Sequence, residues 1–439
     1  MRRAWGEAPT ELCRFIVDAK YEILTAKHID KLKDLIVDHI GIAAGAAAGA
    51  DSSEPFLKKA VQALHGGGGD RPLDGLHEGF DFDDTHAASI LHPGATAIPA
   101  ALAQAELSHS DGKSFLLAVA VGYEITTRLG RGLNYGGYTR GFHNTATAGI
   151  FGATAAICKL RRFSASQTAD ALGLALSRAG GTMQFLANGA WNKRLHPGFA
   201  VHDAFVGAAL AGAGAVGATE PVEGAHGLLH AFSATGTGEG VTEGLGTEWG
   251  FAATAMKPFP ACRMTHAAIE AVVNVAAREK EKENEETKRR EIDGFTVELS
   301  PGSFPIVATA IPNKLRPRTV VDAQFSVYYQ VAVAWLHGVG AGWAMYEKLG
   351  DADVLALCRR VTAVVADDVR DFEARVTFRL RRRIVHPLGE DEHPFSREQV
   401  HNKFLGVTAA CYSEDRQREI LDTVERIDTI NVDELLQIL

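Results

Sequence analysis

Most of the sequence up to about residue 256 follows a helical pattern, in which apolar residues recur every three or four positions. Residues 29–50 begin as an amphipathic helix and become rich in alanine and glycine, as in a helix that packs closely against others. Ser164 or Ser166 stands where a cap is expected for the helix that follows. Further helices of this small-residue type are expected at 95–105, 112–129, 145–160, 166–179 and 199–213.

The pattern changes near Lys257. Residues 292–300 alternate between apolar and polar side chains and are rich in β-branched residues, which predicts a strand. Residues 374–385 also alternate and predict a hairpin, although it has no Asn-Gly or Asp-Gly turn. A helix is expected over 320–344 between them, and residues 396–439 return to a helical pattern.

The order of these segments predicts a mostly α protein with an inserted α/β domain. Residues 1–256 would form the first part of a large helical domain, and residues 257–395 a smaller α/β domain. Residues 396–439 would return to the helical domain and complete it. A chain of 439 residues is long enough for such an arrangement with a large core.

Composition excludes several classes of function. No apolar run is long enough to cross a bilayer, and the net charge of −9 without a basic stripe argues against nucleic acid as a partner. The five cysteines are widely spread and form no Cys-x-x-Cys, so neither a disulfide framework nor a zinc ribbon is indicated. Glu7 and Glu11 follow the basic start, which fits neither a secretory signal nor a transit peptide. We therefore expect a cytoplasmic protein.

Short polar islands interrupt the most apolar part of the sequence. Burying an unpaired charge costs roughly several kcal/mol, so such groups are tolerated where they converge on one another or on a charged ligand. We interpret the islands as one active site assembled from distant segments, whose lysines and histidines form a basic pocket in an acidic protein. They are DFDDT at 81–85 with LHPG at 91–94, GFHNT at 141–145, NKRLHPG at 192–198 and KPFPAC at 257–262.

At these islands the sequence resembles the MmgE/PrpD family, which includes 2-methylcitrate dehydratase, cis-aconitate decarboxylase and iminodisuccinate epimerase. The resemblance covers essentially the whole chain and also rests on KPFPACRMTHAAIEA at 257–271 and AQFSVYYQVAVA at 323–334. It implies a helical domain and a lid-like α/β domain with the active site between them. It also implies a homodimer, a small di- or tricarboxylate substrate, and chemistry without a metal or organic cofactor.

The resemblance also assigns active-site positions. It matches a first active-site loop, a central histidine, two lysines and a pocket tyrosine. We add Arg194, beside Lys193, and Cys262, as a pocket wall, to the expected substrate-binding residues. The matched positions are Asp81, Thr85 and His92 in the loop, His143 as the central histidine, Lys193 and Lys257 as the lysines, and Tyr329 as the tyrosine.

The step shared by the family's reactions is the handling of a proton on carbon next to a carboxylate. Such carbon acids are weak, so catalysis needs a positioned base and cations that stabilise the developing charge. His143 is the candidate base, because only histidine has an unperturbed pKa near neutrality. Lys193 and Lys257 would bind carboxylates, and an acid near His92 or Tyr329 would assist loss of hydroxide.

Each of these residues also has an ordinary structural explanation. His143 could be a core histidine bonded to the backbone, and Lys193 a surface lysine. Lys257 lies at a domain junction, one of the aspartates at 81–84 could cap a helix, and Tyr329 is typical of a helix packing face.

The sequence ranks the possible reactions as follows. Dehydration of 2-methylcitrate or a longer alkylcitrate comes first, and epimerisation of an iminodisuccinate-like dicarboxylate is the alternative. Decarboxylation stands third. The resemblance implies that cis-aconitate decarboxylases have a histidine at the position of Cys262. A homodimer without catalytic activity comes last. Two departures from the family pattern suggest it: the segment at 66–79 is shorter than usual, and the hairpin at 379–383 lacks the usual glycine turn.

Overall fold

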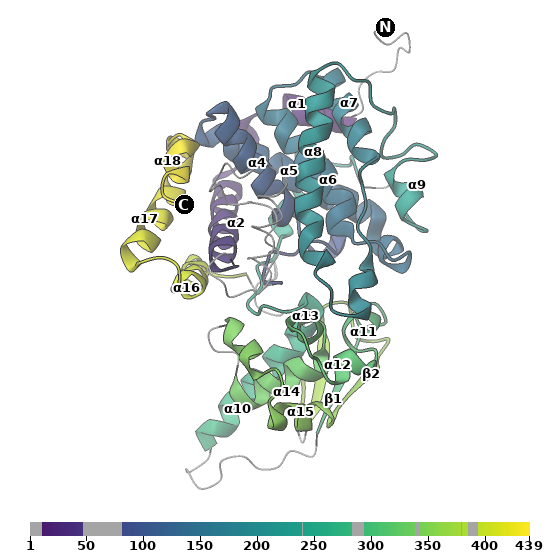
Figure 1. The fold of residues 1–439 in the computed structure, drawn as a ribbon, viewed down its shortest axis with the longest axis vertical. Helices are drawn as coiled ribbons and strands as arrows, with labels where there is room; N and C mark the ends of the chain where they lie inside the picture. The colour runs from purple at the N-terminus through teal and green to yellow at the C-terminus, as the bar shows by residue number, and fades with distance from the viewer. Residues whose placement is uncertain are drawn as a thin grey trace.

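The computed structural model describes residues 11–46, 81–238, 240–282, 294–338, 342–378, 380–384 and 394–439. Figure 1 shows a larger helical part and a smaller α/β part that meet at one boundary. Each part has its own buried core. One core contains residues from 12–256 and from the C-terminal helices, and the other lies almost wholly within residues 259–376. The mostly α class with a smaller α/β unit, expected from the sequence, is confirmed.

The helical part is built around two central helices, α5 (Gly112–Thr139) and α6 (Asn144–Leu160). Their contact depends on small residues, because a Cβ placed on Gly152 would lie 1.8 Å from the hydroxyl of Thr126. The alanine- and glycine-rich pattern therefore produces short distances between helices. The helices around this pair are α1 (Glu11–Asp18), α2 (Ala26–Gly45), α4 (Gly94–Ser108), α7 (Ala165–Leu176), α8 (Asn192–Gly212) and α9 (Leu228–Phe232).

The C-terminal segment contributes α16 (Arg397–Thr408), α17 (Glu414–Glu425) and α18 (Val432–Leu436) to the helical part. Phe404 of α16 packs so closely on α2 that a Cβ on Gly41 would lie 2.9 Å from its ring. The backbone N–H of Gly112 donates to the carbonyl of Ile430 at 2.8 Å. The two ends of the described chain are thus joined in one packed unit.

The α/β part contains a four-stranded sheet in the order β2-β1-β3-β4. The strands are β1 (Phe295–Leu299), β2 (Val361–Val365), β3 (Ala374–Phe378) and β4 (Leu380–Ile384). β1 pairs parallel with β2 and antiparallel with β3, and β3 pairs antiparallel with β4. Helices α10 (His266–Lys282) and α14 (Val327–His337) pack against the sheet, and α15 (Ala352–Cys358) packs on α14. The strand expected at 292–300 and the hairpin expected at 374–385 are therefore present.

Two of the predicted element boundaries are wrong. The helix expected over 320–344 is divided into α13 (Val320–Gln324), α14 and a 3₁₀ segment at Gly342–Lys348. Ser326 begins α14 by accepting a hydrogen bond from the N–H of Tyr329, and Gly338, at φ 74°, ends it. The helix expected over 199–213 begins earlier, at Asn192, and contains Pro197, which donates no backbone hydrogen bond within it.

Ser164 caps α7 as one of the two expected candidates, and Gln167 completes a capping box with it. Within the described chain, no helix combines the length and the apolar character that crossing a membrane requires. Residues 66–79 and Arg379 lie outside the described residues, so neither departure from the family pattern has a structural description.

Candidate active site

The polar islands converge on one cavity at the boundary between the two parts. Each island contributes at least one side chain to its wall, so distant segments meet as expected. A second group of lining residues is apolar. The polar residues include Asp81, Thr85, His92, His143, Lys193, Lys257, Cys262 and Arg263, and the apolar ones include Met183, Phe185, Ile306, Phe325 and Phe372.

The loop at 81–85 is buried and held from both sides. Asp81 adopts a left-handed backbone conformation, with φ 49°, which costs energy for any residue other than glycine. Thr85 exchanges two backbone hydrogen bonds with Ala255, at 2.8 and 2.7 Å. Lys403 of α16 donates to the carbonyl of Phe82 at 3.1 Å and pairs with Asp38 of α2 at 2.6 Å. The helical part therefore fixes the shape of this loop.

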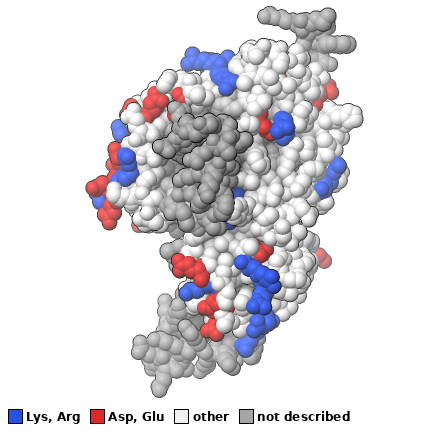
Figure 2. All heavy atoms as spheres, in the orientation of Figure 1, with Lys and Arg blue, Asp and Glu red and all other residues white. Residues whose placement is uncertain are grey.

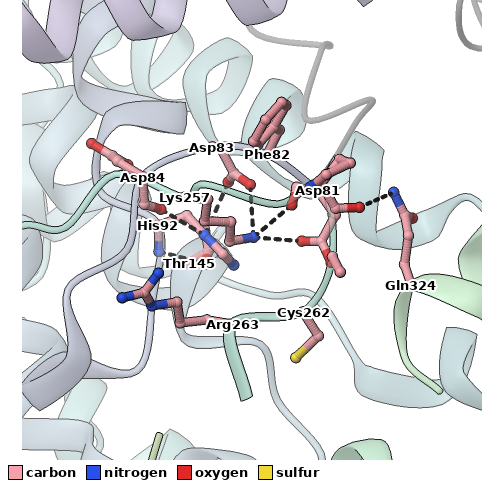
Figure 3. Close-up of polar contacts among 12 residues, drawn as sticks. Asp81, Phe82, Asp83, Asp84, His92, Thr145, Lys257, Cys262, Arg263 and Gln324 are labelled. Carbon is pink, nitrogen blue, oxygen red and sulfur yellow. Dashed lines mark hydrogen bonds and ion pairs between the residues drawn. The ribbon is translucent and has the colours of Figure 1, made fainter. Parts of the chain in front are cut away.

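Lys257 is completely buried, and its ammonium group has three acceptors in the loop. They are the carbonyl and the carboxylate of Asp81, both at 2.9 Å, and the carboxylate of Asp83 at 3.4 Å. Figure 3 shows these side chains gathered around the ammonium group. An ammonium has three N–H groups, so these contacts account for all of its donors. Lys257 thus organises the loop.

Lys193, from the first turn of α8, contacts the same carboxylate oxygen of Asp81 at 2.7 Å. Burial opposes ionisation of Asp81, but Lys193 and Lys257 together outweigh it and hold the pKa of Asp81 below its ordinary value. Asp81 is therefore a carboxylate that two lysines share.

His92 lies on the other side of Asp83. Its Nδ1 is 2.8 Å from the carbonyl of Asp84 and 3.0 Å from the carboxylate of Asp83. Because a carbonyl only accepts hydrogen bonds, Nδ1 carries the proton, and Nε2 is the proton-accepting atom of the neutral ring. Burial lowers the pKa of His92 to about 4 although Asp83 favours the charged form.

Asp84 has a structural role. Its carboxyl group accepts hydrogen bonds from the hydroxyl of Tyr123 at 2.6 Å and from the N–H of Gly94 at 3.0 Å. Burial raises the pKa of Asp84 to about 7. A Cβ on Gly94 would lie 2.3 Å from that hydroxyl, which explains the glycine of the LHPG island.

His143 precedes the first turn of α6 and is almost fully buried. Its N–H donates to the carbonyl of Gly181 at 3.0 Å, and its Nδ1 is 3.1 Å from Nδ1 of His196. Its Nε2 is buried and has no hydrogen-bond partner among the described residues. Burial, with the positive charge of Lys193, lowers the pKa of His143 well below its ordinary value. The ring is therefore neutral at pH 7 and lines the cavity.

Of the remaining expected residues, Thr85 and Cys262 line the cavity, whereas Tyr329 and Arg194 do not. The hydroxyl of Thr85 is buried and unpaired among the described residues, and Cys262 lines the cavity as a thiol, because burial raises the pKa of Cys262 to about 11. Tyr329 lies in the α/β core and donates to the carbonyl of Met345 at 2.7 Å. Neither Tyr329 nor Arg194 is among the described residues that line the cavity.

Sequence analysis missed Arg263, which lines the cavity while almost fully buried, and the apolar wall around it. Phe372 of that wall has φ 65°, a strained conformation for a large side chain. His196 was expected only as part of the polar island at 192–198. The helical spacing of Lys193 and His196, three positions apart, would have placed them on one face had α8 been predicted to start at Asn192.

Asp81, Asp83 and His92 offer three ligand atoms within 4.8 Å of one another, a spacing that a metal ion could use. Lys257 already contacts both of these carboxylates, so a metal ion there would compete with a buried ammonium group. The expectation of metal-free chemistry stays a prediction.

Comparison with known proteins relates this chain to one family. The sequence model of the MmgE/PrpD N-terminal domain matches residues 75–239, and that of the MmgE/PrpD C-terminal domain matches residues 259–429. A cis-aconitate decarboxylase of Aspergillus terreus is 25% identical over 98% of this chain and 95% of its own length. The cis-aconitate decarboxylase-like protein oryM of Aspergillus oryzae is 26% identical over 99% of this chain and 97% of its own.

We predict that Lys257→Met lowers the free energy of unfolding by about 3–5 kcal/mol, because it leaves buried carboxylates without their cation. Adding Asp81→Asn should recover part of that loss. Urea and thermal unfolding measure both effects, with Lys20→Met on the exposed surface as the matched control. Equal stability of the Lys257 and Lys20 variants would contradict the assignment of Lys257 to the loop.

Proposed function

The chain belongs to the MmgE/PrpD family, and from this premise we propose that it is a lyase acting on a small, citrate-like tricarboxylate. The proposed reaction is dehydration of 2-methylcitrate or a longer alkylcitrate. The observation that carries the proposal is the unpartnered Nε2 of His143, buried in a cavity that two lysines also line. The names of relatives that align over the whole chain support a tricarboxylate substrate.

His143 is the proposed general base. A proton on carbon next to a carboxylate is only weakly acidic, so the base needs a free lone pair within reach of the substrate. The neutral ring of His143 provides one, since its Nε2 forms no hydrogen bond to the described residues. The reaction breaks the C–H bond, moves its electron pair into the new double bond, and releases hydroxide from the neighbouring carbon.

Lys193 and Arg263 are proposed to hold the substrate carboxylates. Both are buried and line the cavity, where a fixed positive charge stabilises the enediolate-like charge that develops during proton removal. Lys257 is proposed to act through the loop, because its contacts go to Asp81 and Asp83.

His92 is the better placed of the two proposed acids. It lines the cavity, and Asp83 would stabilise its protonated form while that form assists the departing hydroxide. Tyr329, the other candidate, has its hydroxyl bonded to the carbonyl of Met345 in the α/β core. The apolar wall, which includes Phe185, Phe325 and Phe372, would accept the alkyl branch of an alkylcitrate.

Decarboxylation is the second candidate, and the names of the relatives favour it. It would use the same cationic wall, but Cys262 offers a neutral thiol where those enzymes are expected to have a histidine. Epimerisation would need the same base and a second proton donor on the opposite face, for which His92 is again available. A chain without catalytic activity is least favoured, because it would have no use for so many buried charges.

We further propose that the protein is a homodimer and works in the cytoplasm. Phe199, Val206 and Leu210 share one face of α8 and are 56%, 42% and 47% exposed, and Figure 2 shows few charged side chains over this helix. An apolar helix face of this kind is typical of an interface. None of the five cysteines, all of which lie in the described residues, forms a disulfide, which suits a reducing compartment.

The reaction is tested by proton NMR in D2O with 2-methylcitrate, citrate, cis-aconitate and iminodisuccinate. We expect an alkene product from 2-methylcitrate, and we expect His143→Gln to slow its formation at least about 100-fold, the usual contribution of a general base. His109→Gln, which changes an exposed histidine, is the matched control. Release of CO2 from cis-aconitate would favour decarboxylation, and solvent deuterium in an unchanged substrate would favour epimerisation.

The homodimer is tested by size-exclusion chromatography with light scattering. We expect a mass of twice the 47.0 kDa of one chain, and we expect Val206→Asp with Leu210→Asp to reduce it to the mass of one chain. Leu107→Asp makes the same change at a leucine that is 62% exposed on α4 and should leave the dimer intact. A monomeric wild-type protein would contradict the proposal.

A further inference from the structure

His143 and His196 form a buried pair that the proposed reaction does not explain by itself. His143 lies before α6 and His196 lies in α8, with Nδ1 of each ring 3.1 Å from Nδ1 of the other. The ring centroids are 5.3 Å apart, and 1% and 7% of the two residues is exposed. We propose that His196 is a positioning residue that fixes the tautomer of His143 and thereby makes it a base.

The pair is built by three separate backbone segments. Gly181, from the segment between α7 and α8, accepts the N–H of His143 and has φ 99°. A Cβ on Gly181 would lie 3.3 Å from two atoms of the His196 ring and 2.7 Å from the Cβ of Ala146. A glycine is therefore needed here both for its conformation and for the space that the second ring occupies.

The 3.1 Å distance between the two Nδ1 atoms requires that one of them carries a proton and the other does not. Burial lowers the pKa of His196 to about 4 and lowers the pKa of His143 well below its ordinary value, so both rings are neutral at pH 7. Two lone pairs at this separation would repel each other, and two N–H groups would clash. One Nδ1 must therefore donate to the other.

Two tautomer arrangements satisfy this requirement. If His196 donates, His143 carries its proton on Nε2, and that N–H is buried without an acceptor among the described residues. If His143 donates, its Nε2 is a lone pair, and an unsatisfied buried acceptor costs less than an unsatisfied buried N–H. The structure therefore favours His143 as the donor and leaves Nε2 free to accept a proton.

At position 196, a histidine suits the role of partner to His143 better than a carboxylate would. When Nε2 of His143 takes a proton, the N–H on Nδ1 still donates to His196, which stabilises the imidazolium as the carboxylate of a Ser-His-Asp triad does. His196 provides this without adding a negative charge near a substrate that carries several. The inference rests on the proposed function for the direction of proton transfer, whereas the tautomer itself does not depend on turnover.

The test compares His196→Asn with His196→Leu. Asparagine places an oxygen at the distance from the backbone at which histidine has Nδ1, and leucine places a methyl group there. His202→Leu, at an exposed histidine of the same helix, is the matched control. The first readout is the ¹⁵N chemical shift of the ring nitrogens of His143 in histidine-labelled protein, assigned with His143→Gln.

We expect a protonated Nδ1 and an unprotonated Nε2 on His143 in the wild-type protein and in His196→Asn, and a mixture of tautomers in His196→Leu. A proton on Nε2 in the wild type, or the same tautomer in all variants, would overturn the proposal. Because this readout needs no substrate, it stands even if the substrate class is wrong.

The second readout is kinetic and uses whichever tricarboxylate the D2O experiment identifies. His196→Leu should lower kcat about 10–100-fold with KM changed less than about threefold, and should shift the pH profile of kcat. His196→Asn should recover most of the activity. A loss of kcat in both variants with an unchanged pH profile would indicate a merely structural role and would contradict the proposal. Lys193, His92 and Asp81 are the other charged or titratable groups that affect the pKa of His143, and all three are unchanged in these variants.

Discussion

The buried ammonium group of Lys257 is the interaction on which the rest of the site depends. It lies between Asp81 and Asp83, and a carboxylate without such a cation would not remain ionised at this depth. The same contacts hold Asp81 in its left-handed conformation, and through Asp81 they place Lys193 at the cavity wall. Through Asp83 they also fix the ring of His92. Lys403 and Asp38 extend this arrangement to the C-terminal helices, so the shape of the site depends on the packing of the whole helical part.

With the lysines and aspartates paired, His92 and His143 are the groups of the site that can change their protonation state. The carboxylates of Asp81 and Asp83 nearly balance the lysines, while burial keeps His92 and His143 neutral. A neutral imidazole that lines a buried cavity is a base whose lone pair is available at pH 7. The two rings differ in what their Nδ1 atoms contact. His92 contacts a carbonyl and a carboxylate, which favour its protonated form, and His143 contacts only another neutral ring. This difference supports the proposed roles of His92 as the acid and His143 as the base.

Much of this could be predicted from the sequence, because charged islands in apolar sequence must converge to be tolerated. That reasoning, with the family resemblance, predicted that His92, His143, Lys193 and Lys257 meet, and all four line one cavity. It could not give distances, so Lys257 was expected to bind substrate although its donors are used by the loop. No helix was predicted over 192–198, so the helical spacing of Lys193 and His196 was not recognised. The residues around Tyr329 in the sequence are typical both of a pocket and of a packed helix face. The fold distinguishes these alternatives, because it places the Tyr329 hydroxyl against the carbonyl of Met345.

The cavity has too little positive charge to balance a tricarboxylate until a histidine is protonated. Arg263, Lys193 and Lys257, set against Asp81 and Asp83, leave one excess positive charge for the proposed tricarboxylate, which carries three negative ones. A bound tricarboxylate should raise the pKa of His92 from about 4, so that binding takes up a proton and tightens as the pH falls. Calorimetry with propane-1,2,3-tricarboxylate, which has no hydroxyl group to lose, measures this at pH 7.5 in phosphate and in Tris. We predict binding enthalpies that differ between the buffers by the amount expected for uptake of about one proton. Equal enthalpies in the two buffers, or release of protons, would contradict this account.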